Sequence, residues 1–380
     1  MSTIRRLAAA TLLWFGFLFL IVFGSLRGVQ GAQPVWGTIP SSAPVLRSPN
    51  FECNDPERLA PWTIHKLLGD PEIAYARERF LGSCEASGIF EHLESIDSLV
   101  ILAQDIETPP DPGKPFDIAF SQSFSTTPGV DYSVSGWMLS LCGGSAIPND
   151  CPEGLYMAKL IGLDPTGGSD PLSPQIVWTE NRQNFTESRW VNLRTAVRAQ
   201  AENMTVFARL NSPFLHHGNH GYLDAISVVR SPIAYFSGLP ATVAGTTLTL
   251  TWESEQSPDI SGIQGGAYQL LVDIEARQLP SGEWKTVISD SVGSNSLPYS
   301  VKCADSSYQF RIRPRSEQSP DVGPGVFPNQ RYPGVWSEPV TVDFTGITMT
   351  TPKRVSPAAP IEGDVLLFLP LVSRQVACVE

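Results

Sequence analysis

SSYQFRIRPRSEQ, at 306–318, and GVWSEPVTVDF, at 334–344, are the stretches of this chain that decide its fold. In each of them, large apolar side chains alternate with polar or charged ones, the period-two pattern of a strand that buries only one face. A long polar loop separates the two stretches. Together they predict an antiparallel pair of strands that closes an all-β domain.

Four more strand-like segments precede this pair, and together they predict a domain at 233–345. They are TLTLTW at 247–252, YQLLVDIEARQL at 268–279, EWKTVIS at 283–289 and LPYSVKC at 297–303. The domain resembles the fibronectin type III family, since Trp252 matches the family's core tryptophan and Tyr308 its tyrosine-corner residue. Trp336-Ser337 matches the entry to the last strand, whereas Cys303 and the loop at 317–333 depart from the family's pattern. The resemblance implies an immunoglobulin-like sandwich that serves as a spacer or docking module.

A second series of strand-like segments predicts a larger domain at 48–230. The segments are SLVILAQDI at 98–106, DIAFSQSFS at 117–125, DYSVSGWMLSL at 131–141, YMAKLIGL at 156–163, QIVWTE at 175–180, WVNLRTAVRA at 190–199, MTVFARLN at 204–211 and GYLDAISVV at 221–229. Regularly spaced strands broken by Pro and Gly turns are typical of a β-sandwich or jelly roll. The segment at 70–94 interrupts the series, and its sequence fits either a helix or an irregular insertion.

This larger domain resembles the jelly-roll carbohydrate-binding modules of the galactose-binding-like type. The resemblance rests on the opening Asn50-Phe51-Glu52, on FSQSFSTTPGVDYSVSGWM at 120–138, on IGLDPTGGSDPLSPQIVW at 161–178 and on the closing strand with Asp224. It implies a structural calcium at Glu52 and Asp224, where the two ends of such a module meet, because calcium prefers oxygen ligands. From the residues alone, Asp224 equally fits a turn cap and Glu52 a solvated side chain.

Sugar binding needs exposed aromatic faces, because the apolar C–H face of a sugar ring packs against them, together with nearby polar groups. Most aromatic residues of the larger domain lie within alternating strands, which favours a position in the core. Trp178 and Trp190 border loops. These two tryptophans are therefore the predicted ligand-binding residues.

The N-terminus has the organisation of a secretory signal. Arg5 and Arg6 precede an apolar run at 7–26, and small residues follow. The predicted segment at 1–31 is a cleaved signal peptide or an uncleaved membrane anchor, because the apolar run is about as long as a bilayer-spanning helix. Either alternative exports the rest of the chain, to the outside or to the cell surface.

Two linkers and a short tail complete the predicted organisation. Pro-rich and Ser-rich linkers are expected at 32–47 and 346–364. The C-terminal tail at 365–380 resembles short segments of some secreted bacterial proteins and equally fits a final packed strand.

The cysteines are expected to form disulfides, since the chain is exported and has no CxxC spacing. The short loop between Cys142 and Cys151 favours that pair, and Cys53–Cys84 and Cys303–Cys378 are the other candidates. Sequence alone leaves the connectivity open.

Charge and motifs limit the functions that fit. The net charge is −12, which argues against a nucleic-acid partner because phosphate binding needs clustered Lys and Arg. GxSxG, HExxH and P-loop motifs are absent from the sequence, so an enzyme is not expected.

We therefore expect an exported, non-catalytic binding protein that attaches to a glycan or cell-surface polymer, with the fibronectin-like domain as spacer. The expected partner is a polysaccharide, and the only cofactor implied is a structural calcium. One alternative is a structural or adhesive protein of the cell envelope, with envelope proteins as partners and no sugar site. The other is a polysaccharide hydrolase or lyase on a jelly-roll scaffold, which would need two opposed carboxylates.

Overall fold

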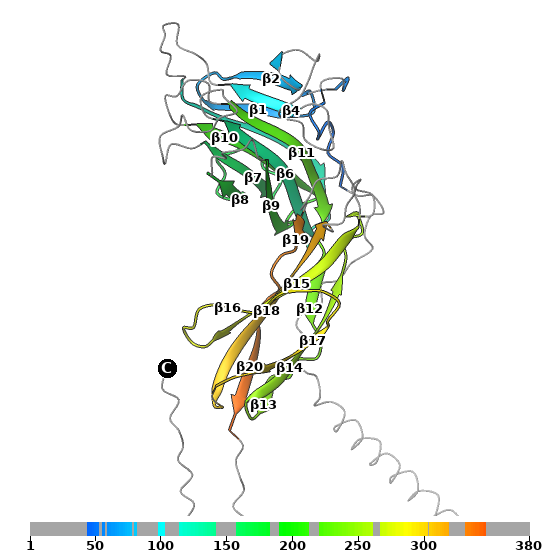
Figure 1. Cartoon of the computed structure of the whole chain (residues 1–380), viewed down its shortest axis with the longest axis vertical. Helices are drawn as coiled ribbons and strands as arrows, with labels where there is room; N and C mark the ends of the chain where they lie inside the picture. The colour runs from blue at the N-terminus through cyan, green and yellow to red at the C-terminus, as the bar shows by residue number, and fades with distance from the viewer. Residues whose placement is uncertain are drawn as a thin grey trace, which may run out of the picture.

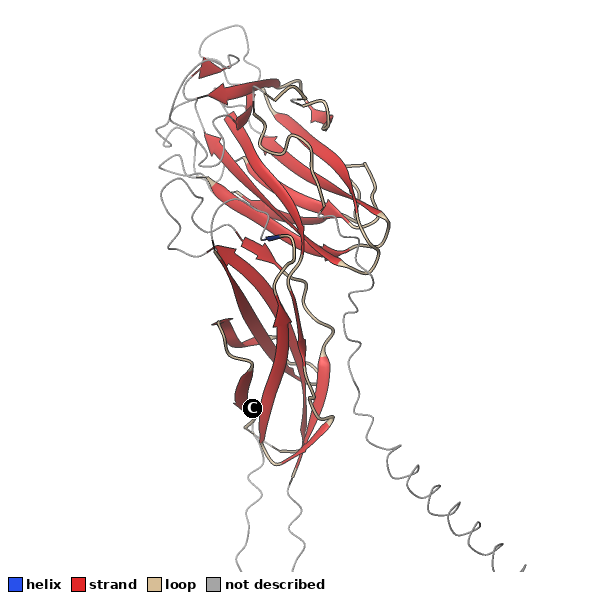
Figure 2. Ribbon diagram, turned by 90° about the vertical axis from the view of Figure 1, so that its right-hand side faces the viewer, coloured by secondary structure: helices blue, strands red, loops and turns tan. Residues whose placement is uncertain are grey.

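The computed structural model describes residues 44–52, 55–57, 59–77, 80–81, 98–102, 114–141, 157–182, 190–212, 220–260, 267–302, 304–318 and 331–346. These residues form strands β1 to β20 and no α-helix, which confirms the all-β prediction (Figures 1 and 2). Within this part of the chain there is no helix long and apolar enough to cross a membrane. The predicted signal or anchor at 1–31, the tail at 365–380 and most of both linkers lie outside the described residues.

Two antiparallel sheets form the first sandwich. Their strands are β1 (Thr63–Leu68), β2 (Glu72–Arg77), β3 (Phe80–Leu81), β4 (Ser98–Leu102), β5 (Phe116–Ser125), β6 (Asp131–Leu141), β7 (Ala158–Asp164), β8 (Val177–Asn181), β9 (Val191–Arg198), β10 (Asn203–Ser212) and β11 (His220–Arg230). The five-stranded sheet has the order β1-β5-β10-β7-β8, and the six-stranded sheet has the order β3-β2-β4-β11-β6-β9.

The core of the first sandwich lies between these sheets. Ile118 and Phe120 on β5 and Leu210 on β10 face Leu223 and Ile226 on β11, and all are fully or almost fully buried. The residues between them in sequence point to the outer faces, as the period-two alternation requires.

β2 lies in the segment at 70–94, for which the sequence left a helix and an irregular insertion open. It pairs antiparallel with β4, and Ile73 and Tyr75 pack against the core while Ala74 faces the other way. Side chains that alternate between two faces belong to a strand, and the described part of this segment is one.

The second sandwich is formed by β12 (Ile233–Phe236), β13 (Thr242–Ala244), β14 (Thr247–Glu255), β15 (Tyr268–Gln278), β16 (Lys285–Ser291), β17 (Ser296–Ser300), β18 (Ser306–Gln318), β19 (Arg331–Pro333) and β20 (Val340–Thr345). One sheet has the order β12-β14-β17 and the other has the order β13-β20-β18-β15-β16, with β19 paired to β18.

The predicted pair of strands at the end of the second sandwich is confirmed, since β18 and β20 are antiparallel with Tyr308 opposite Val342. Trp252 is 1% exposed in the core. The Tyr308 ring lies 6.2 Å from that of Tyr299 and 5.7 Å from that of Phe344. Among the residues described, the Tyr308 hydroxyl has no backbone partner, so it packs as an aromatic residue and does not form the expected tyrosine-corner hydrogen bond.

β19 lies at the junction of the two sandwiches (Figure 1). Tyr332 on β19 is fully buried, packs with Val229 and Ile260, and shares a hydrogen bond with Ser227 of the first sandwich at 2.7 Å. Arg230, at the end of β11, forms a buried ion pair with Asp259. The junction thus has a small apolar core and a buried ion pair of its own.

Lys159 on β7 is an ionisable residue within the first sandwich. Its side chain is completely buried, and its Nζ donates a hydrogen bond to Ser140 Oγ at 2.8 Å. Burial lowers the pKa of Lys159 from its ordinary value of 10.5 to about 7, because a low-dielectric environment disfavours the ammonium form.

This pKa shift predicts how stability depends on pH. Between the folded and the unfolded pKa, the unfolded chain binds a proton at Lys159 that the folded chain does not, so stability rises with pH. We expect the free energy of unfolding to rise by up to about 1.4 kcal/mol per pH unit above neutral pH. Urea denaturation at neutral and mildly alkaline pH measures this slope. Lys159→Met should remove this pH dependence of stability, whereas substitution of the exposed Lys66 should leave it unchanged. An equal slope in both variants would contradict its assignment to Lys159.

Candidate ligand-binding site

Trp178 lies on the edge strand β8, directly opposite Gly162 on β7. A Cβ atom at Gly162 would lie 2.6 Å from Trp178 Cε3, so the indole rests against the backbone of this glycine. The Trp178 side chain stays partly exposed, whereas Trp62 and Trp137 of the same sandwich are buried. The glycine therefore lets an aromatic ring lie on the outer face of the sheet and still reach solvent.

Trp178 belongs to a row of residues that crosses the five-stranded sheet on its outer face. Cross-strand pairing joins Trp178 to Gly162, Gly162 to Phe207, and Phe207 to Ser121. The centroid of the Phe207 ring lies 6.0 Å from that of Trp178 and 6.4 Å from that of His65. His65 Nε2 and Ser121 Oγ are 2.8 Å apart. This set, here called the Trp178 row, has an aromatic end at β8 and a polar end at β1. Trp178 and His65 are partly exposed, whereas Phe207 and Ser121 are buried.

The loop at 165–176 joins β7 to β8 at one edge of this sheet. Burial lowers the pKa of His65 on β1, and the negative charge of Asp170 in this loop acts in the opposite direction by a smaller amount. Asp164 fixes the start of the loop, because its Oδ1 accepts hydrogen bonds from Thr166 N at 2.8 Å and Thr166 Oγ1 at 2.6 Å. The loop thus adds a carboxylate to the outer face that carries the Trp178 row.

The second predicted ligand-binding tryptophan, Trp190, lies at the other sheet. It immediately precedes β9 and packs edge-on against Tyr222 with ring centroids 6.3 Å apart. Val100 and Leu139 belong to the same cluster, in which Trp190 is partly buried and the other side chains are buried. The structure therefore does not bring Trp178 and Trp190 into one site.

A backbone hydrogen bond joins the segments that carry the predicted calcium residues, Glu52 and Asp224. Asp224 is fully buried, and its Oδ1 accepts a hydrogen bond from Ala225 N at 2.7 Å, where a bulge interrupts β11. Ile226 N donates to Pro49 O at 3.0 Å, which holds the segment that leads to Glu52 beside this bulge. In the described ranges, no group of three or more His, Cys, Asp or Glu side chains is placed to hold a metal ion. Calcium, which takes about six to eight oxygen ligands, stays a prediction.

All the candidate disulfide residues, Cys53, Cys84, Cys142, Cys151, Cys303 and Cys378, lie outside the described residues. Their pairing also stays a prediction.

Sequence reasoning missed His65, Ser121 and Phe207, which complete the Trp178 row. In the sequence, Phe207 alternates with apolar residues of the core, so it cannot be told apart from any other residue of a half-buried strand. A usable signal was Gly162, because a glycine inside a strand often marks a close approach by another group. Here that group is the indole of Trp178.

Comparisons with known proteins find only low similarity to solved structures. No protein-family model matches it, and no curated protein matches it. Among solved structures, TmCBM61 in complex with β-1,4-galactotriose has a TM-score of 0.32 at 11% identity, over 50% of this chain and 99% of its own. The tandem CBM22 domains of Xyn10C from Paenibacillus barcinonensis have a TM-score of 0.26 at 11% identity, over 75% of this chain and 88% of their own. The adhesin domain of Epf from Streptococcus pyogenes has a TM-score of 0.23 at 11% identity, over 66% of this chain and 77% of its own. Similarity at this level does not assign a ligand to this chain.

Proposed function

We propose that this protein is an exported, non-catalytic binding protein that attaches to a glycan through the outer face carrying the Trp178 row. The observation that supports this most directly is the position of Trp178, which rests on Gly162 and stays partly exposed. A partly exposed indole on a rigid sheet offers an apolar face against which the C–H face of a sugar ring packs.

Polar groups at the far end of the row would orient the sugar. His65 and Ser121 lie at the other end of the row, and Asp170 approaches His65 from the loop. Sugar sites pair such an aromatic platform with a few placed hydrogen-bonding groups, because the platform alone does not distinguish one hydroxyl arrangement from another.

The second sandwich would act as a spacer of fibronectin type III kind. The sheet of β12, β14 and β17 packs against the sheet that contains β15, β18 and β20, the arrangement expected of an immunoglobulin-like sandwich. The buried Trp252 and the β18–β20 pair are the features of the resemblance that this arrangement supports.

The deciding experiment is glycan binding by the full chain. We expect saturable binding to one class of glycan on a broad panel, and we expect Trp178→Ala to weaken it by about tenfold or more, as for other aromatic anchors of binding sites. Trp284→Ala is the matched control, because it removes the same side chain from the second sandwich, where Trp284 stacks against Arg277 and Arg311.

Two results would overturn this proposal. A folded chain that binds nothing on the panel would favour a structural or adhesive protein of the cell envelope. Cleavage of a bound polysaccharide, detected as new reducing ends, would favour the hydrolase or lyase.

A further inference from the structure

A cavity of about 440 Å³ lies between the two sandwiches, and arginine is its main polar lining. Arg194 on β9 comes from the first sandwich, and Arg313, Arg315 and Arg331 come from β18 and β19 of the second. Glu317 contributes the one carboxylate of the lining. This cavity, here called the arginine cavity, is thus lined by more positive than negative side chains in a chain whose net charge is −12.

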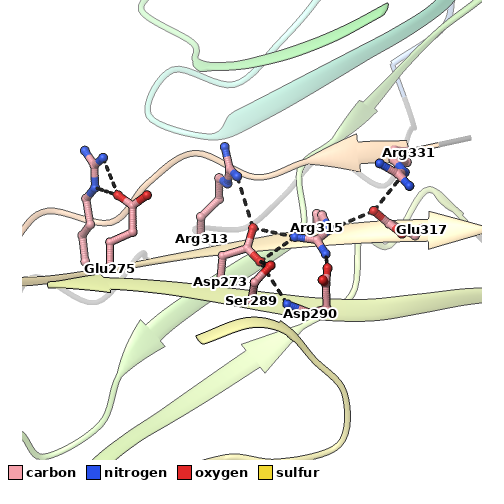
Figure 3. Close-up of polar contacts among 9 residues, drawn as sticks. Asp273, Glu275, Ser289, Asp290, Arg313, Arg315, Glu317 and Arg331 are labelled. Carbon is pink, nitrogen blue, oxygen red and sulfur yellow. Dashed lines mark hydrogen bonds and ion pairs between the residues drawn. The ribbon is translucent and has the colours of Figure 1, made fainter. Parts of the chain in front are cut away.

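The arginines of the second sandwich already have carboxylate partners (Figure 3). Asp273 lies 2.5 Å from Arg315 and 3.1 Å from Arg313. Glu317 lies 2.8 Å from Arg315 and 2.9 Å from Arg331. Asp290 also pairs with Arg315. These ion pairs hold the guanidinium groups in place on one side of the cavity and offset much of their charge.

Arg194 differs from them. Its guanidinium is partly buried, and in the described part of the chain it has no carboxylate partner and one hydrogen bond, to the backbone oxygen of Asn192 at 3.3 Å. Burial and the positive charges of Arg331, Arg315 and Arg313 lower the pKa of Arg194 to about 10, although the negative charge of Glu317 acts in the opposite direction. A partly buried charge without a carboxylate partner keeps part of its desolvation cost, so an anion bound beside Arg194 would stabilise it.

The walls of the cavity indicate an organic anion. Thr179 and Thr195 add hydroxyl groups, and Val335 and Trp336 add apolar surface. A water molecule occupies about 30 Å³ of liquid, and an inorganic oxyanion of a few atoms would fill only a small part of the space. The volume is within the usual range of about 300–1,000 Å³ for small-molecule sites.

We propose that the arginine cavity binds the carboxylate of an acidic sugar unit, with the Arg194 guanidinium as its main partner. The planar guanidinium matches a carboxylate through two parallel hydrogen bonds, while the hydroxyl and apolar walls receive the sugar ring. The assignment to a sugar rests on the proposed function, whereas binding of an organic anion does not. The site is separate from the Trp178 row, because Trp178 and Thr179 are adjacent on β8 and point to opposite faces.

Isothermal titration calorimetry of the full chain with sodium glucuronate, glucose and sodium sulfate tests this proposal. We expect glucuronate to bind and glucose not to bind, and we expect Arg194→Met to weaken glucuronate binding by about tenfold or more, as for loss of a charged hydrogen bond. Arg198→Met is the matched control, because Arg198 lies on the same strand, pairs with Asp131 and does not line the cavity.

Glu317→Gln gives a second test in the opposite direction. It removes the carboxylate that competes with the ligand and frees Arg331, while Asp273 and Asp290 still pair with Arg315, so we expect glucuronate to bind more tightly. Trp178→Ala should leave glucuronate binding unchanged, which separates a failure here from a failure of the Trp178 row. Absence of glucuronate binding, equal loss in both arginine variants, or weaker binding by Glu317→Gln would overturn the proposal. Sulfate that binds as tightly as glucuronate would overturn the assignment to a sugar.

Discussion

Replacement of Asp259 by alanine is expected to lower the free energy of unfolding by about 3–5 kcal/mol. Asp259 accepts hydrogen bonds from Arg230 N at 2.8 Å and from Arg230 Nε at 3.0 Å, and the two side chains are 3% and 9% exposed. The substitution leaves the Arg230 guanidinium at the junction of the sandwiches without this partner. A buried charge that loses its partner keeps the desolvation penalty and loses the attraction that offset it.

Urea denaturation of the full chain measures this loss. Asp131→Ala is the control, since Asp131 pairs with Arg198, whose side chain is 50% exposed, and exposed pairs contribute about 0–1 kcal/mol. The double variant Arg230→Met/Asp259→Leu should recover much of the stability, because it removes both charges together. Equal costs for Asp259→Ala and Asp131→Ala would show that the junction does not depend on the buried pair.

Most strands of both sandwiches could be predicted from sequence because their signal is local, but β1, β12, β13 and β19 were not among the predicted segments. The β18–β20 pair follows from the alternation of Tyr308, Phe310 and Ile312 with arginines, and Trp252 follows from its place in TLTLTW. Burial of one face is decided within each strand, so a single chain reveals it. The strand at Glu72–Arg77 was missed because it is short and followed by a charged stretch.

The sites could not be predicted, because they depend on which strands meet. Trp178 and Trp190 both border loops and read alike, but they lie on different sheets. Arg194 and Arg331 are far apart in sequence: Arg194 fits the solvated side of a half-buried strand, and Arg331 falls in the predicted loop at 317–333. Only the packing of β19 against β9 brings them to one cavity. No local pattern contains this information.

The fold also predicts a large loss of stability when a substitution opens a cavity in the core of the second sandwich. Trp252 is 1% exposed and packs with Leu250 and Phe310 in the larger core of that sandwich. Among the described residues its indole N–H has no hydrogen-bond partner, so its contribution is apolar packing. We expect Trp252→Ala to lower the free energy of unfolding by about 3–5 kcal/mol, the usual cost of a large core cavity.

Differential scanning calorimetry combined with limited proteolysis shows which sandwich loses stability. We expect the second sandwich to unfold first in Trp252→Ala, with cleavage within β14 to β20, because the first sandwich keeps a separate core. Trp284→Ala is the control, since Trp284 is partly exposed and stacks on arginines at the surface, where such contacts contribute about 0.5–1 kcal/mol. Equal losses for the two tryptophans would mean that Trp252 is not the centre of this core. A single transition that shifts as a whole would show that the buried junction around Tyr332 couples the two sandwiches into one cooperative unit.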